Sequence, residues 1–110
     1  MPMYLFQVSY TPEAWTALIK NPQSAKERTE ALIAKLGGKN HGLWYAFGDY
    51  DVIGITEFPS NVASAASGIM LAAGGALKTV KTTPLLSVEE GVAAMQQAAD
   101  ASGAYSGIKE

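Results

Sequence analysis

The sequence contains no cysteine and comparatively little charge. Without a thiol it can form neither disulfides nor thiolate metal sites, and a cysteine nucleophile is excluded. Charged residues make up 16% of the 110 residues, whereas soluble domains typically contain roughly 25%. The net charge of −2 comes without a cluster of lysine and arginine, so nucleic acid is not an expected partner. The shortage of charge indicates that another chain covers part of the surface.

Long apolar runs and cofactor motifs are also missing. No apolar run reaches 18 residues, and the start MPMYLFQVSYTPE lacks the features of a secretory signal. We therefore expect a cytoplasmic protein without a membrane partner. The single histidine with scattered carboxylates has no recognised ligand spacing, so no metal is expected. The glycines at residues 72–76 lack the lysine of a phosphate loop and the strand that precedes a dinucleotide motif, so no cofactor is expected.

The remaining residues predict strands that alternate with helices. The predicted strands are residues 3–10, 43–47, 52–58 and 77–86, which are rich in branched and aromatic side chains. Thr11-Pro12-Glu13 has the signature of a helix start, and Ser24-x-x-Glu27 is a candidate capping box for a second helix. Double glycines at 37–38 and 74–75 end the helices before the second and fourth strands.

Three predicted helices carry apolar residues at helical spacing. The inner stripe of the helix before Gly37 would be Ala25, Thr29, Leu32, Ile33 and Leu36. The helix after Pro59 has a 3.6-period face of Val62, Ala65, Ala66, Ile69, Met70 and Ala73. A last amphipathic helix at 87–100 carries Val88, Val92, Met95 and Ala99 on one side.

The order βαββαβ predicts an α+β, ferredoxin-like fold: a four-stranded antiparallel sheet with helices on one face, plus a C-terminal helix. We expect residues 1–87 to form this domain. Residues 88–110 would form an amphipathic helix and a frayed tail, which packs on the same domain or on a partner. Segments 32–45 and 69–82 share one plan, a helix end, a double glycine and a strand, so the chain consists of two similar halves.

The sheet face without helices also carries apolar residues, because Ile53 and Ile55 alternate with Val52 and Gly54. At about 25 cal/mol per Å², several hundred Å² of exposed apolar surface would cost several kcal/mol, comparable with the stability of a small domain. We therefore expect an obligate homodimer that buries this face. A higher oligomer is an alternative.

The segment Gly48-x-Tyr50-Asp51, followed by VIGITEFPS, resembles the G-x-Y-D hallmark of the GYD domain family. The opening MPMYLFQVSYTPEA, the stretch ALIAKLGGK and the acidic SVEE are similar to the same family, over about residues 1–95. The resemblance implies a dimeric α/β barrel, in which two sheets enclose a shared interior. It implies no particular reaction, since superfamily relatives include cofactor-free monooxygenases, haem-handling enzymes, isomerases and ligand sensors. Pro84 departs from the pattern and requires an edge position or a strand end.

The hairpin of residues 43–58 holds the candidate site. With a turn at 48–50, Phe47 would face Asp51, Tyr45 would face Ile53, Leu43 would face Ile55 and His41 would face Glu57. A purely structural interpretation gives Gly48 a positive φ and makes Asp51 an acceptor of backbone N–H groups. In the functional interpretation, the ligand-binding residues are Trp44, Tyr45, Phe47, Tyr50 and Asp51. No catalytic residue is assigned, and the candidates are His41, Tyr50 and Asp51.

Three functions remain open at this point. The favoured one is a homodimeric scaffold, or a domain that binds a small apolar or aromatic molecule without catalysis, because no nucleophile, metal cluster or cofactor motif stands out. The first alternative is a cofactor-independent monooxygenase or isomerase that acts on a small aromatic compound inside the barrel. The second is a higher-order assembly module joined through the C-terminal helix.

Overall fold

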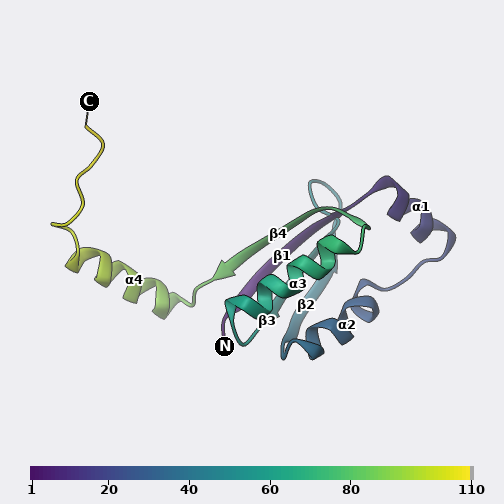
Figure 1. Ribbon diagram of the computed structural model, residues 1–110, viewed down its shortest axis with the longest axis horizontal. Coiled ribbons are helices and arrows are strands. Elements are labelled where there is room, and N and C mark those ends of the chain that lie inside the picture. The colour runs from purple at the N-terminus through teal and green to yellow at the C-terminus, as the bar shows by residue number, and fades with distance from the viewer. Residues whose placement is uncertain (110) are drawn as a thin grey trace.

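The computed structural model describes residues 1–109. Its elements are β1 (Met3–Tyr10), α1 (Pro12–Lys20), α2 (Ala25–Lys35), β2 (Lys39–Tyr45), β3 (Val52–Glu57), α3 (Asn61–Ala73), β4 (Leu77–Leu85) and α4 (Val88–Asp100). The strands form one antiparallel sheet in the order β2-β3-β1-β4, with α2 and α3 on the same face (Figure 1). The predicted ferredoxin-like fold is confirmed. None of the described helices is long and apolar enough to cross a membrane.

Hydroxyl side chains begin all four described helices. The Oγ1 of Thr11 accepts the Ala14 N–H at 3.1 Å, and Ser24, Ser60 and Ser87 occupy the equivalent N-cap positions. These caps satisfy N–H groups that have no partner within the helix, which fixes where each helix begins. The predicted starts at Thr11 and Ser24 are therefore confirmed.

The core lies between the sheet and its helices. Alternate residues of β1 are buried there, namely Tyr4, Phe6, Val8 and Tyr10. Phe58, just after β3, is fully buried, and its ring lies 6.1 Å from that of Tyr4 and 6.0 Å from that of Phe6. The predicted inner stripe of α2 also faces this core, with Ala25 buried in it. Strand alternation and helix periodicity were sufficient to find this layer.

The β2–β3 hairpin corrects the predicted register by one residue. The N–H of Ala46 donates to the carbonyl O of Asp51 at 2.7 Å, and Tyr45 pairs with Val52 rather than Ile53. Leu43 consequently faces Gly54 rather than Ile55, and Phe47 lies beyond the strand rather than opposite Asp51. The loop spans residues 46–51 instead of 48–50, and each one-residue slip moves a side chain to the other face of the sheet.

The apolar face of α3 points away from the sheet, although such a face usually packs inward. Val62, Ile69 and Met70 are 79%, 67% and 56% exposed, whereas Ser64 and Ser67 are 3% exposed against the sheet. The inward side of the helix therefore consists of small residues. Apolar periodicity alone selects the wider apolar arc and gives the wrong side of this helix.

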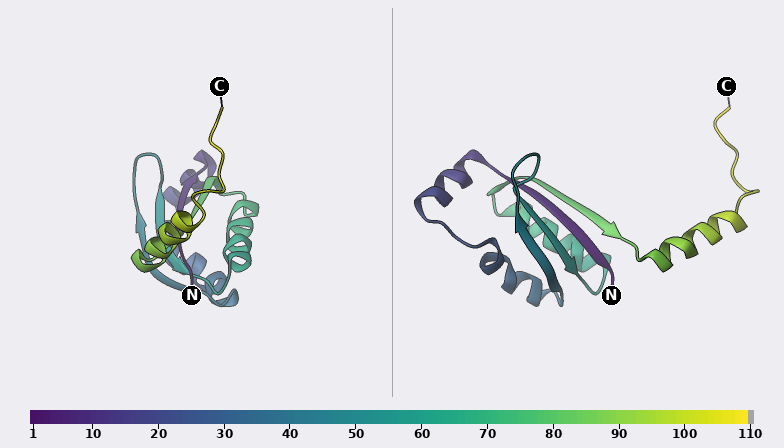
Figure 2. Two further views of the ribbon diagram at one scale, coloured as in Figure 1. Left: turned by 90° about the vertical axis from the view of Figure 1, so that its left-hand side faces the viewer. Right: turned by 180° about the vertical axis from the view of Figure 1, so that it is seen from behind.

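The helix-free face of the sheet is apolar in its centre and polar at one corner. Its apolar members are Met3, Leu5, Trp44, Ile53, Ile55 and Leu85, and its polar corner consists of Gln7, Ser9, Thr79 and Lys81. We call this surface the open face. Trp44 is 56% exposed on it. Within the described chain, no helix covers this surface (Figure 2).

Strand β4 is an edge strand that pairs only with β1 in the described sheet. Pro84 lies in it opposite Tyr4. An edge strand can accommodate a residue without an N–H group, because one side of the strand has no neighbour. The edge position that Pro84 requires is confirmed.

Helix α4 projects beyond the end of β4, away from the other elements (Figure 1, Figure 2). A capping box holds its first turn: the Glu90 N–H donates to Ser87 Oγ at 3.0 Å, and the Ser87 N–H donates to Glu90 Oε1 at 2.9 Å. The radius of gyration is 17.8 Å, compared with about 13 Å for a compact chain of 100 residues. Val88 and Met95 are 80% and 70% exposed, so the apolar side of α4 has no cover within the described chain.

Candidate functional site

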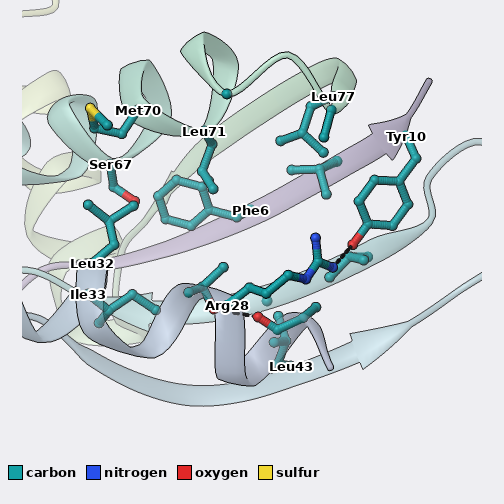
Figure 3. Close-up of a pocket in the computed structure, with 17 residues that line it drawn as sticks. Phe6, Tyr10, Arg28, Leu32, Ile33, Leu43, Ser67, Met70, Leu71 and Leu77 are labelled. Carbon is teal, nitrogen blue, oxygen red and sulfur yellow. Dashed lines mark hydrogen bonds between the residues drawn. The ribbon is translucent and has the colours of Figure 1, made fainter. Parts of the chain in front are cut away.

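An apolar cavity of about 250 Å³ lies between α2, α3 and the sheet (Figure 3). Helix α2 packs over β2 and α3 over β4, so the central strands form the floor between them. The floor consists of Phe6, Val8, Val52 and Gly54, and the walls include Leu32, Ile33, Ser67, Met70 and Leu71. No carboxylate among the described residues lines it. The helix layer thus covers the two edges of the sheet and leaves a concave apolar site over its centre.

A cation lies at one end of this cavity. The Nη2 of Arg28 donates to the Oη of Tyr10 at 2.7 Å, and the Arg28 Cζ lies 5.7 Å from the centre of the Tyr10 ring. Partial burial alone would lower the pKa of Arg28, but the hydroxyls of Tyr10 and Tyr45 raise it above its ordinary value. The guanidinium is therefore charged at every physiological pH.

Tyr45 fixes the start of α2 and so helps to position Arg28. Its Oη accepts the Ala25 N–H at 2.8 Å and donates to the carbonyl O of Gln23 at 2.9 Å. These bonds connect the end of β2 to the first turn of α2, which carries Arg28. The tyrosine chosen from the sequence as a ligand-binding residue lies beside the site and supports the helix that forms one wall.

Asp51 performs the structural task that the sequence indicated for it. Its Oδ2 accepts the Tyr10 N–H at 2.8 Å, and its own N–H donates to the carbonyl O of Val8 at 2.8 Å. Gly48 has a φ of +138°, which residues with a side chain rarely adopt. Asp51 thus joins the hairpin loop to the end of β1, next to the tyrosine that contacts Arg28.

The other predicted site residues are spread over three surfaces. Trp44 lies on the open face opposite Ile53, Phe47 is completely exposed in the loop, and Tyr50 is half-buried in the same loop. None of the five predicted ligand-binding residues lines the cavity between α2 and α3. The one-residue change in register explains part of this, because it directs Tyr45 and Trp44 to opposite faces of the sheet.

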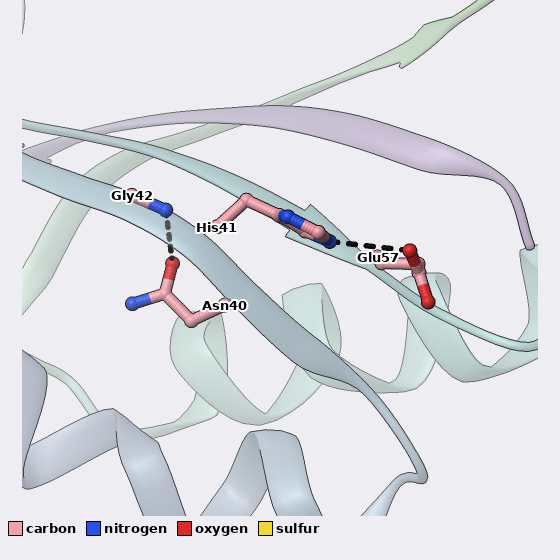
Figure 4. Close-up of polar contacts among 4 residues, drawn as sticks. All are labelled: Asn40, His41, Gly42 and Glu57. Carbon is pink, nitrogen blue, oxygen red and sulfur yellow. Dashed lines mark hydrogen bonds and ion pairs between the residues drawn. The ribbon is translucent and has the colours of Figure 1, made fainter.

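His41 forms an ion pair with Glu57 when it is protonated. The two side chains meet at 3.1 Å between His41 Nε2 and Glu57 Oε1 (Figure 4). His41 lies in a bulge between Asn40 and Gly42, where the Asn40 Oδ1 accepts the Gly42 N–H at 3.0 Å. Glu57 belongs to the open-face side of β3, so this pair lies on the opposite side of the sheet from the cavity. No group of three or more potential metal ligands occurs among residues 1–109.

Arg28 and Tyr10 were not identified from the sequence as site residues. A signal was present, since Arg28 lies three residues after Ala25 and four before Leu32, beside the inner stripe of its helix. Tyr10 lies on the buried side of β1. Their contact joins residues that are 18 positions apart, which no local pattern specifies.

The comparisons with known proteins identify a family and nothing finer. The family model of the GYD domain matches residues 4–98, which include β1 to β4 and most of α4. No curated protein matches the chain significantly.

Proposed function

The chain belongs to the GYD domain family, and we propose that it binds a small molecule in the cavity between α2 and α3. The observation that carries this proposal is an apolar hollow of about 250 Å³ with a charged and hydroxylated end. Small-molecule sites combine apolar walls with a few polar groups in this way. An engineered cavity of about 150 Å³ accepts benzene, so this one has the volume for one ring with a short substituent.

Replacing Ser67 by leucine is expected to weaken binding of single-ring compounds at least about tenfold, because one filled contact of this kind is worth about 1.4 kcal/mol or more. Ser67 is buried at the cavity wall, so the larger side chain fills ligand space. Ligand-observed NMR with a set of aromatic fragments measures the change. Ala65→Leu adds the same side chain to the same helix at an exposed position outside the cavity, and should leave binding unchanged. Equal binding to both variants would show that the ligands bind elsewhere.

We propose further that the protein acts as a homodimer joined through the open face. Four strands spaced at about 4.8 Å and some eight residues long give a footprint of about 20 by 25 Å, or roughly 500 Å². A stable interface covers about 800 Å² on each partner. The exposed apolar side of α4 supports the same proposal, because the helix projects far enough to add contact area on the second copy.

The His41–Glu57 pair favours an enzymatic alternative, a cofactor-independent oxygenase or isomerase. In a dimer joined through the open faces, this pair and Trp44 would face the enclosed interior. A carboxylate that orients a histidine is a common arrangement for a general base. Turnover of a phenolic substrate would then fall by about 10²–10⁴-fold in His41→Gln. Asn40→Ala in the same bulge is the control, and unchanged turnover in His41→Gln would remove this alternative.

A further inference from the structure

We infer that the ligand of the cavity between α2 and α3 is a small aromatic carboxylate, with its ring over the central strands and its carboxylate at Arg28 and Tyr10. This inference rests on the proposed binding function and adds the chemical class of the ligand. It depends on three features of the site, which are its unbalanced charge, the donors at one end and its volume.

The cavity has a positive charge that no acidic group balances. Arg28 is the only charged residue in its lining. Within residues 1–109, the only salt bridge is the one between His41 and Glu57, on the other side of the sheet, so the guanidinium of Arg28 has hydroxyl neighbours but no counter-charge within contact distance. An anionic ligand would supply that counter-charge, whereas an amine would be repelled.

Two hydrogen-bond donors converge at this end of the cavity. The Tyr10 Oη accepts one N–H of Arg28, which leaves the tyrosine O–H able to donate to a ligand. The guanidinium has further N–H groups in a planar fork, which matches the two oxygens of a carboxylate. A phosphate would bring about two negative charges to a lining with one cation. The donor set therefore fits a carboxylate better than a phosphate.

The apolar part of the cavity accounts for the rest of the ligand. Phe6, Leu32 and Leu71 extend the site away from Arg28 without another charge (Figure 3). Burial of a ring against such side chains contributes binding energy through the apolar area removed from water. One ring and a short chain that ends in a carboxylate fit both halves of the site.

The test compares three ligands of equal shape: 3-phenylpropanoate, 3-phenylpropan-1-ol and 3-phenylpropylamine. Isothermal titration of the full chain should give an affinity for the acid about 10- to 100-fold above that for the alcohol, as expected for hydrogen bonds to a charged group. The amine should bind more weakly than the alcohol. Added salt should reduce the preference for the acid, since salt screens the charge interaction.

Arg28→Met should abolish the preference for the acid while the alcohol still binds. Lys26→Met removes one positive charge from the same helix outside the cavity and should keep the preference. Arg28→Lys retains the charge without the planar fork and should give an intermediate preference, and thermal unfolding establishes that each variant is folded. Equal affinity of the wild type for acid and alcohol overturns the carboxylate inference but leaves the binding function intact. If none of the three ligands binds, the proposed binding function fails as well.

Discussion

Replacing Phe58 by alanine is expected to lower the free energy of unfolding by about 3–5 kcal/mol. Phe58 is 0% exposed and packs against the rings of Tyr4 and Phe6, so truncation leaves a cavity in the centre of the core. Small domains have a total stability of only about 5–15 kcal/mol. The variant should therefore be close to unfolding at room temperature, which urea denaturation followed by circular dichroism measures.

Phe47→Ala provides the matched control for this experiment. The Phe47 side chain is 101% exposed in the hairpin loop, so its loss should change the free energy of unfolding by less than about 0.5 kcal/mol. A small effect at Phe58 would contradict the core described above. A large effect at Phe47 would show instead that this side chain is buried in solution, against a second copy.

Replacing Ile55 by aspartate should dissociate the proposed dimer, with a dissociation constant at least about a hundredfold higher than that of the wild type. Ile55 lies in β3 between Leu5 and Gly42, in the apolar centre of the open face. In a symmetric dimer each change occurs twice, so two carboxylates would be buried without a partner. Analytical ultracentrifugation over a concentration series measures the constant.

Ile19→Asp is the control for the dimer experiment, because Ile19 is 78% exposed on α1 and lies outside the open face. Its dissociation constant should equal that of the wild type. If the wild type is a stably folded monomer at micromolar concentration, the open face is not an interface between copies. If Ile55→Asp remains dimeric, the contact is made elsewhere, for example through the exposed apolar sides of α3 and α4.

Local patterns in the sequence determined the fold class. The hydroxyl at Thr11 followed by Pro12 begins a helix, and the double glycine at 37–38 ends the next one, whichever element packs against them. Alternation along β1 and the 3.6-residue stripe of α2 defined which sides face the core. Such signals depend on neighbouring residues only, and together they give the order βαββαβ and the ferredoxin-like sheet.

Only the tertiary structure decided where the site lies. The register of the β2–β3 hairpin depends on the length of its loop, and the inward side of α3 depends on how closely the helix approaches β4. Apolar period specifies neither of these. The meeting of Arg28 with Tyr10, and the cavity beside it, result from placing α2 and α3 over opposite edges of one sheet. The sequence thus determined the elements and their order, whereas the distances between elements, on which a binding site depends, followed from long-range packing.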